Sequence, residues 1–365
     1  MNSTNNNVVT ILLLIFLFTF SAYFSNYLYN SELTNPYLNI IWWNRDIFLI
    51  NYELFGFVKK GLIGTIFNIN QENLVFFSKT LATIIIIFSI FIYSLIVIDK
   101  NLIKEKKYLI LFGISPFLFS NIGYDFGRLD HLGIVFILLL TLLIIKKKDI
   151  FILEIVSPIL ILIHEIHFFT TIIFLSYVQF KINRTAFSKL YVLFLSFLVL
   201  LILHFYGDLD QSLYNKYVNT YSFIKIYFQQ TQIENTLLWW SYLFDQRYTT
   251  ILYRHIFNII LYLFLCFFIL RFFKKNKIQN LLLISTYLLL FILGIDHSRF
   301  LSIFIFNIVM LFLILKFNEK ININPPKFKN YYYLIFFLGP WGIGPCLPIL
   351  TILKKFFLYG QLTFN

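Results

Sequence analysis

The sequence predicts an all-α, polytopic membrane protein that folds as one transmembrane domain over residues 1–365. Hydrophobic residues make up 59% of the chain and charged residues only 13%, which excludes an ordinary soluble protein of this length. Apolar runs recur from end to end, and their lengths suit membrane helices. Together they predict about ten or eleven crossings of the bilayer.

Basic residues lie mainly in alternate short connections between the apolar runs. Five connections hold eighteen of the thirty basic residues and four of the seventeen acidic residues; they lie near residues 99–107, 146–149, 181–189, 271–277 and 316–329. This is the positive-inside pattern, so we predict that these connections and the N-terminus are cytoplasmic. The net charge of +13 therefore sets the topology and does not predict nucleic-acid binding.

The N-terminal half is predicted to contain two spans and two hairpins. The first span covers residues 8–28. A long outer segment follows, about residues 29–73, whose mixed apolar and charged residues predict helices lying in the membrane interface. The second span, residues 74–98, returns to the first basic connection, and hairpins follow at residues 108–145 and 150–180.

The C-terminal half continues with a span at residues 190–206 that leads to a second outer segment, about residues 207–250. A further span covers residues 251–273, and a third hairpin is predicted at residues 278–315. The last apolar stretch, residues 331–350, is interrupted by glycine and proline. It therefore either crosses once or re-enters the membrane.

The length of the second hairpin predicts the depth of its tip. Each arm has about 15 residues, or about 23 Å of helix, against about 30 Å of hydrocarbon. The tip sequence His164-Glu165-Ile166-His167 should therefore lie below the outer membrane surface, in a recess.

Groups able to carry out chemistry are concentrated on the predicted outer side. All six histidines and twelve of the seventeen carboxylates fall on that side. Most of them lie at the tips of the three hairpins or in the two outer segments. Ionisable groups retained in a membrane are costly unless a function uses them. We therefore expect the three tips to share one pocket.

The first tip carries Asp125, Arg128, Asp130 and His131. The guanidinium of Arg128 suits phosphate oxygens. The carboxylates of Asp125 and Asp130 are candidate catalytic bases, and His131 is a candidate substrate-binding residue. The alternative is a self-neutralised polar turn that packs two helices.

The second tip carries His164, Glu165 and His167. His164 and Glu165 are candidate catalytic bases, and His167 is a candidate ligand for substrate hydroxyls. Two histidines three residues apart share a helix face, so a metal site is an alternative, although the spacing is not that of HExxH. A hydrogen-bonded structural pair is the third interpretation.

The third tip carries Asp296, His297 and Arg299, all candidate substrate-binding residues. Four further basic candidates lie in the outer segments or near the outer end of a span: Arg45, Lys60, Arg247 and Arg254. They are expected to contact either a substrate pyrophosphate or lipid headgroups. The chain has no GxxxxGK, GxGxxG or GxSxG motif, so no nucleotide, cofactor or obligatory metal is implied.

With these residues in view, the chain resembles the polytopic polymerases of bacterial surface polysaccharides, the O-antigen and capsule polymerases of the Wzy type and their EpsG-like relatives. The resemblance covers nearly the whole chain. It rests on the span count, the aromatic-rich composition, the two long outer segments and the stretches at residues 57–64, 124–130 and 163–165.

The resemblance implies a GT-C-like enzyme of the bacterial inner membrane that joins polyprenyl-pyrophosphate-linked oligosaccharide repeat units at the periplasmic face. Arg128 and Arg299 would hold the pyrophosphate, and Arg45, Arg247 and Arg254 are the next candidates for this role. The resemblance also implies membrane lipid and a chain-length regulator protein as partners.

Three other functions stay open. A GT-C-type glycosyltransferase that uses a polyprenyl-phosphate sugar would take Asp46 or Glu53 in the first outer segment as its base. A flippase or other transporter of lipid-linked saccharides would have charged groups on both approaches to a midplane site, whereas Glu154 is the main ionisable group in the cytoplasmic halves. A metal-dependent hydrolase would be built on the second tip.

Overall fold

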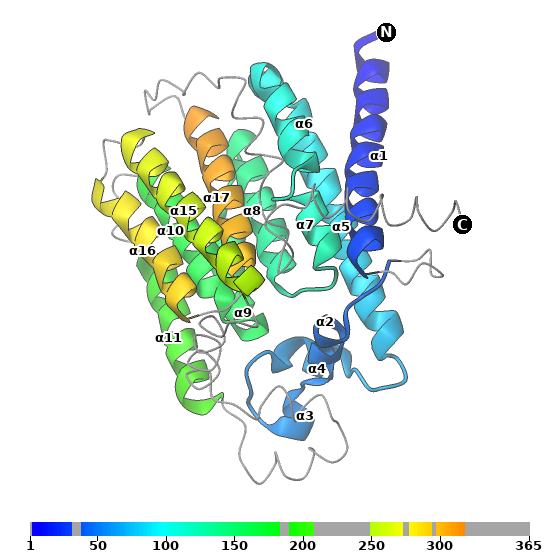
Figure 1. The fold of residues 1–365 in the computed structure, drawn as a ribbon, viewed down its shortest axis with the longest axis vertical. Helices are drawn as coiled ribbons and strands as arrows, with labels where there is room; N and C mark the ends of the chain where they lie inside the picture. Colours follow the sequence, from blue (N-terminus) through cyan, green and yellow to red (C-terminus); the bar gives the residue numbers. More distant parts are fainter. Residues whose placement is uncertain are drawn as a thin grey trace.

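The computed structural model describes residues 2–30, 38–182, 190–207, 249–272, 277–293 and 297–317, and every regular element within these ranges is a helix. The predicted all-α fold class is therefore confirmed. Most of the long helices run in roughly the same direction and form one bundle, with short helices gathered beyond one of its ends (Figure 1). Most of the second predicted outer segment and the last apolar stretch lie outside the described residues.

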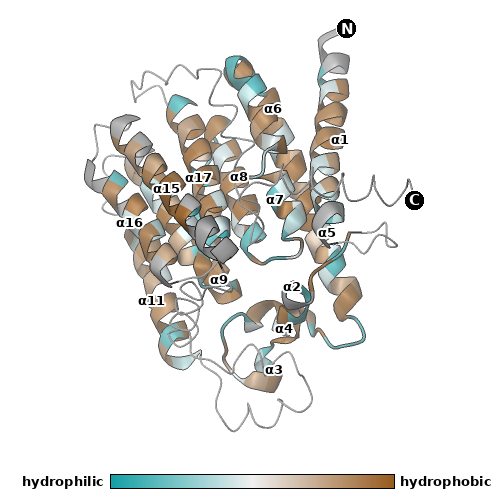
Figure 2. Cartoon of the chain, in the orientation of Figure 1, coloured by the Kyte–Doolittle hydropathy of each residue, from teal (hydrophilic) through white to brown (hydrophobic). Residues whose placement is uncertain are grey.

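Within the described part of the chain, three helices are long and apolar enough to cross a membrane: residues Asn7–Tyr27 of α1 (Asn2–Asn30), α5 (Leu74–Ile98) and α17 (His297–Phe317). Five further apolar stretches are shorter: Asp130–Ile145, Phe151–Ile163, Phe168–Phe180, Leu190–Tyr206 and Asn258–Phe267. Hydrophobic residues dominate the bodies of the helices, and polar residues gather toward their ends (Figure 2).

Burial places α17 at the centre of the bundle and α1 at its edge. In the apolar window of α17, 78% of the residues are buried inside the protein, against 22% for α1. Helix α17 packs against α8 (Asp130–Ile145), α15 (Thr249–Phe272), α16 (Lys277–Leu293) and α10 (Ile173–Ile182). Most of the exposed side chains of α1 are large and apolar, including Leu13 and Phe16, as expected of a helix that faces hydrocarbon.

At the second predicted hairpin, α9 (Phe151–Ile163) ends just before residues 164–167, η3 (Phe168–Ile172) and α10 follow them, and α9 packs against η3. Helix α9 has 13 residues, which corresponds to about 20 Å. That is shorter than the hydrocarbon core of a bilayer. Helix α11 (Leu190–Tyr206) packs along α9 and also contacts η3.

The first predicted hairpin is wrong in one respect, because its first arm is not a single helix. It is divided into α6 (Lys106–Ile114) and α7 (Phe119–Tyr124). Ser115 is extended, with φ −69° and ψ 163°, and it precedes Pro116. A proline disfavours helical backbone in the residue before it and has no N–H to donate, which explains the break.

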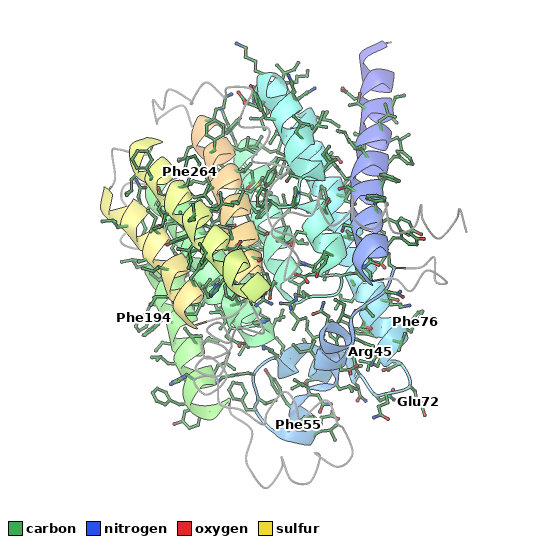
Figure 3. All side chains as sticks on the ribbon, in the orientation of Figure 1. Arg45, Phe55, Glu72, Phe76, Phe194 and Phe264 are labelled. Atoms are coloured by element: carbon green, nitrogen blue, oxygen red, sulfur yellow. The ribbon has the colours of Figure 1, made fainter. Side chains whose placement is uncertain are left out.

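The first outer segment contains the short helices that its sequence predicts: α2 (Trp42–Asp46), η1 (Ile47–Leu49), α3 (Tyr52–Phe55) and α4 (Gly61–Phe67). They lie beyond the ends of α5 and α9, where Arg45 and Phe55 are labelled in Figure 3. A small apolar cluster that includes Phe48, Ile63 and Leu129 attaches this segment to the start of α8. It therefore covers the end of the bundle that carries the first two tips.

Ion pairs hold the opposite end of the bundle together. The ammonium of Lys146, just after α8, lies 2.5 Å from the carboxylate of Asp99, just after α5. Lys316 near the end of α17 pairs with Glu105 in η2 (Lys100–Glu105). Part of the basic charge at this end therefore links neighbouring helix ends.

Candidate functional site

The first tip is a tight turn between α7 and α8. Gly127 has φ +89°, a left-handed conformation that residues with a Cβ rarely adopt, and this turn separates Asp125 from Asp130. The side-chain amide of Asn44 in α2 donates to the backbone oxygens of Asp125 and Phe126, at 3.3 and 3.2 Å. The outer segment thus supports the turn that presents Arg128 and Asp130.

The second tip begins where α9 ends. His164 is extended, with φ −160°, and its Nδ1 accepts a hydrogen bond from the backbone N–H of Ile166 at 3.3 Å. The ring of His167 packs edge-on against that of His164, with 6.2 Å between the ring centroids.

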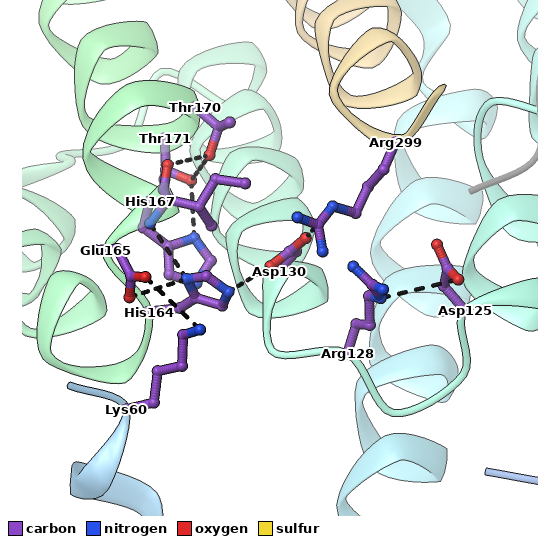
Figure 4. Close-up of polar contacts among 11 residues, drawn as sticks. Lys60, Asp125, Arg128, Asp130, His164, Glu165, His167, Thr170, Thr171 and Arg299 are labelled. Atoms are coloured by element: carbon purple, nitrogen blue, oxygen red, sulfur yellow. Dashed lines mark hydrogen bonds and ion pairs between the residues drawn. The ribbon is translucent and has the colours of Figure 1, made fainter. Parts of the chain in front are cut away.

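Asp130 joins side chains from all three predicted tips. Its Oδ1 lies 3.4 Å from Nε2 of His164, and its Oδ2 lies 3.2 Å from Nε of Arg299 on α17. Asp130 is 4% exposed, so both contacts are made away from solvent. Figure 4 shows His164 and Arg299 reaching Asp130 from opposite sides.

Arg128 interacts with two carboxylates, those of Asp125 and Asp130. Its Nε is 3.8 Å from Oδ1 of Asp125, and its charge also acts on Asp130. Two guanidinium groups, those of Arg128 and Arg299, are therefore placed around Asp130. The cluster has an acid–base side, formed by the second tip, and a guanidinium side.

Lys60 brings the outer segment into the cluster. Its ammonium lies 3.6 Å from Oε1 of Glu165, while Nδ1 of His164 lies 3.4 Å from Oε2. Burial raises the pKa of the Glu165 carboxyl, but Lys60 and His164 together outweigh it and hold the pKa well below its usual range. Lys60 itself has φ +65°, an uncommon conformation for a residue with a side chain.

His167 lies at the base of the cluster, where no part of it is exposed. Its Nδ1 lies 3.4 Å from the hydroxyl of Thr171. Burial, followed by the neighbouring charge of His164, lowers the pKa of His167 to about 4. The ring is therefore neutral at physiological pH and can either donate or accept a hydrogen bond.

Several buried polar atoms of the cluster have unused hydrogen-bonding capacity among the residues that the structure describes. Both carboxylate oxygens of Asp130 and Oε2 of Glu165 make ion-pair contacts but no hydrogen bond of good geometry, and Nε2 of His167 is similarly underused. Buried polar atoms normally make hydrogen bonds of good geometry, so this cluster can take up water or a ligand. This observation favours a binding site over a polar turn that only packs helices.

The other predicted residues differ in their placement. His131 is buried on α8 next to Asp130. The ring of His297 stacks on that of Phe291, with 5.1 Å between the ring centroids. The structure does not bring Arg45 into the cluster, because Arg45 pairs with its neighbour Asp46 at 2.5 Å. Arg247, Asp296 and the side chain of Arg254 lie outside the described residues.

Among the described residues, no group of three or more His, Cys, Asp or Glu side chains has the arrangement of a metal site. The carboxylates of the first two tips are instead paired with cations, since Glu165 contacts Lys60 and Asp130 contacts Arg299.

No family model, curated protein or solved structure matches this chain. The arrangement of the cluster itself therefore carries the functional argument.

Asn44, Thr171 and Asn307 support the cluster and were not among the predicted site residues. For Asn307 the sequence contained a usable signal, since it is an amide in the middle of the apolar α17. Asn44 and Thr171 had no such signal, because polar residues are ordinary near helix ends and turns.

We expect Lys60→Gln to raise the pKa of Glu165. The wild-type carboxyl, with its lowered pKa, contributes stability at pH values above its ordinary pKa of about 4.3, and this is lost as the pH falls through the folded value. Without Lys60 the loss should begin at higher pH. Infrared difference spectra against Glu165→Gln, which isolate the protonated carboxyl band, would measure the shift.

Lys59→Gln is the matched control, because it removes the same charge from the preceding residue. The contact of Glu165 is with Lys60. An equal shift in both variants would contradict a specific pairing of Lys60 with Glu165.

Proposed function

We propose that this protein is a membrane glycosyltransferase that transfers a glycan from a polyprenyl-pyrophosphate carrier to the sugar of another lipid-linked repeat unit. The enzyme would span a bacterial cell membrane about ten or eleven times, with its N-terminus in the cytoplasm and the cluster at the outer face. The observation that carries the proposal is Asp130, which connects an imidazole to a guanidinium in a buried position.

The guanidinium side suits the leaving group. Arg128 and Arg299 are near enough to Asp130 to act on its charge, so an anion placed beside Asp130 would meet both. Guanidinium groups bind phosphate oxygens through several parallel hydrogen bonds. Aimed at the leaving pyrophosphate, they stabilise the negative charge that develops in the transition state.

The acid–base side suits the acceptor hydroxyl. Oε2 of Glu165 is buried, and its one contact of this kind, to Nδ1 of His164, is long at 3.4 Å, so the oxygen can still accept a hydrogen bond. Lys60 and His164 keep this carboxyl ionised, so it can accept a hydrogen bond from a sugar hydroxyl and orient it during loss of its proton. His164 lies within 3.4 Å of Glu165 and of Asp130, where it can share that proton.

The depth of the cluster suits a lipid-linked substrate. The 13 residues of α9 are too few to cross the hydrocarbon, so in the proposed topology the second tip would be set below the membrane surface. Exposed apolar side chains on α4 and the start of α5, Ile66, Phe67 and Phe76, border this end of the bundle. A head group could enter from the side while its polyprenyl chain stays in lipid.

Purified protein in detergent, given a polyprenyl-pyrophosphate-linked oligosaccharide, should form lipid-linked products of two or more repeat units. We expect Arg128→Ala to lower the rate by about 10²–10³, the usual effect of removing one group that stabilises transition-state charge. Product length on gels, with protein amount matched, is the measurement. Because no sealed membrane is present, a transporter would form no product.

Arg45→Ala is the matched control, since Arg45 is paired with Asp46 outside the cluster. We expect it to keep most of the wild-type rate. Wild-type rates in both variants, or no elongation by the wild-type enzyme with any repeat unit from its own cell, would contradict the proposal.

A further inference from the structure

The second tip continues into a turn of unusual geometry. Residues Phe168–Ile172, directly after His167, form the π-helix η3 rather than an α-helix. A π-helix contains one extra residue per turn, and such turns occur often at functional sites. Thr170 and Thr171 lie in the middle of this turn.

A side chain from the centre of the bundle holds this π-helix. The side-chain amide of Asn307 on α17 donates to the backbone oxygen of Thr170 at 2.8 Å. The same amide nitrogen lies 2.6 Å from the hydroxyl of Tyr287 on α16. Asn307 has no exposed surface and lies ten residues beyond His297, about 15 Å along the helix.

The π-helix in turn fixes the ring of His167. Nδ1 of His167 lies 3.4 Å from the hydroxyl of Thr171, as Figure 4 shows. Gly133 of α8 packs directly against both: a Cβ on Gly133 would lie 2.5 Å from Oγ1 of Thr171 and 2.7 Å from Nδ1 of His167. The ring therefore has little freedom to move while η3 keeps its position.

We propose that Asn307 is a positioning residue of this site, which sets the orientation of His167 by holding the π-helix η3 in place. This inference rests on the proposed function for its effect on catalysis, but the coupling from Asn307 to His167 can be measured without any substrate.

Asn307 can hold η3 in place because relaxation of η3 to an α-helix would be costly. If η3 relaxed to an α-helix, its extra residue would have to be accommodated elsewhere. Each residue of an α-helix corresponds to about 100° of rotation, so the preceding tip would turn away from Asp130. The bond from Asn307 to the oxygen of Thr170 opposes that change, and in an apolar interior losing it would leave buried groups unsatisfied.

The test compares Asn307→Leu with Asn280→Leu. Asn280 is a close control, because it is also fully buried, lies on neighbouring α16 and bonds to a tyrosine hydroxyl, that of Tyr177, at 2.6 Å. In protein labelled at histidine, NMR signals of His167 would be identified by their absence in His167→Gln. We expect them to shift in Asn307→Leu and to stay in place in Asn280→Leu.

Turnover gives the second measurement. A misplacement of about 1 Å at a reacting group can lower a rate by as much as 100-fold. We expect kcat for elongation to fall by about tenfold to 100-fold in Asn307→Leu, with KM within about twofold of wild type, because Arg128 and Arg299, the proposed pyrophosphate contacts, lie outside the second tip and η3. Asn280→Leu should keep its kcat.

Thr171→Val provides a second, nearly isosteric variant in case Asn307→Leu does not fold. It removes the hydroxyl next to His167 and should shift the same signals. Unchanged His167 signals in Asn307→Leu, or equal shifts in the Asn280 control, would overturn the coupling. Shifted signals with an unchanged kcat would overturn the positioning role. A wild-type enzyme without elongation activity would instead remove the proposed function and leave the NMR result standing.

Discussion

Asp130→Asn is expected to lower the turnover of glycosyl transfer by about 10²–10⁴, the range by which positioned acid–base groups accelerate reactions. The substitution keeps the shape of the side chain and removes its charge. His164 and Arg299 each contact one oxygen of this carboxylate, so both would lose their shared counter-charge at once. The measurement is kcat for elongation by purified protein.

The same substitution should lower stability. Removing one partner of a buried charge pair leaves the other charge uncompensated, at a cost of about 3–5 kcal/mol. Asp46→Asn is the matched control, since it makes the same chemical change in an ion pair that lies outside the cluster. If Asp130→Asn kept wild-type turnover and the wild-type unfolding temperature, the central place of Asp130 in the site would be disproved.

The helices could be predicted from the sequence because each is an apolar run bounded by polar residues. Helices α5 and α11 have the same bounds as the predicted apolar runs. Helix α9 begins one residue after its predicted run and ends directly before the predicted tip. The break between α6 and α7 was missed, although Ser115-Pro116 is its cause. A proline within an apolar run can bend a helix or end it, and local sequence does not decide between the two.

The chemical groups of the site could also be predicted, but their partners could not. The first two tips and Arg299 were singled out as clusters of ionisable residues at hairpin ends. That Asp130 contacts both His164 and Arg299 depends on the packing of α8 against η3 and α17, which no single segment determines. For Arg45 the adjacent Asp46 already indicated a local pair.

The contribution of Lys60 depends on backbone geometry that hydropathy does not report. Its left-handed conformation begins α4 and turns the side chain toward Glu165. The π-helix η3 was equally invisible, because one extra residue in a turn does not change the pattern of apolar residues.

Gly123→Ala is expected to destabilise the protein strongly, because the backbone of α1 lies directly against this residue of α7. A Cβ on Gly123 would overlap the backbone oxygen and carbonyl carbon of Ala22 in α1. Backbone atoms cannot rotate away as a flexible side chain can, so the helices must separate. Overpacking of this kind costs about 1–3 kcal/mol, and sometimes more. Small residues allow such approaches between membrane helices.

Thermal unfolding in detergent would measure the effect, with Leu13→Ala as the control on the exposed face of α1, where 63% of the leucine is accessible. We expect a clear drop in unfolding temperature for Gly123→Ala and little change for Leu13→Ala. Equal unfolding temperatures for Gly123→Ala and wild type would show that this approach of the two helices is not tight.

The same substitution should also reduce activity, because the α1–α7 contact supports the first tip. The amide of Asn26 in α1 donates to the backbone oxygen of Gly123 at 2.8 Å and to that of Asn39 at 2.9 Å. Asn39 lies in the first outer segment, just before α2, and Asp125 follows Gly123 by two residues. Separating the helices would therefore displace the turn that presents Arg128 and the segment that supports it. A lower kcat in the protein that remains folded would show that α1, at the edge of the bundle, helps to align the site.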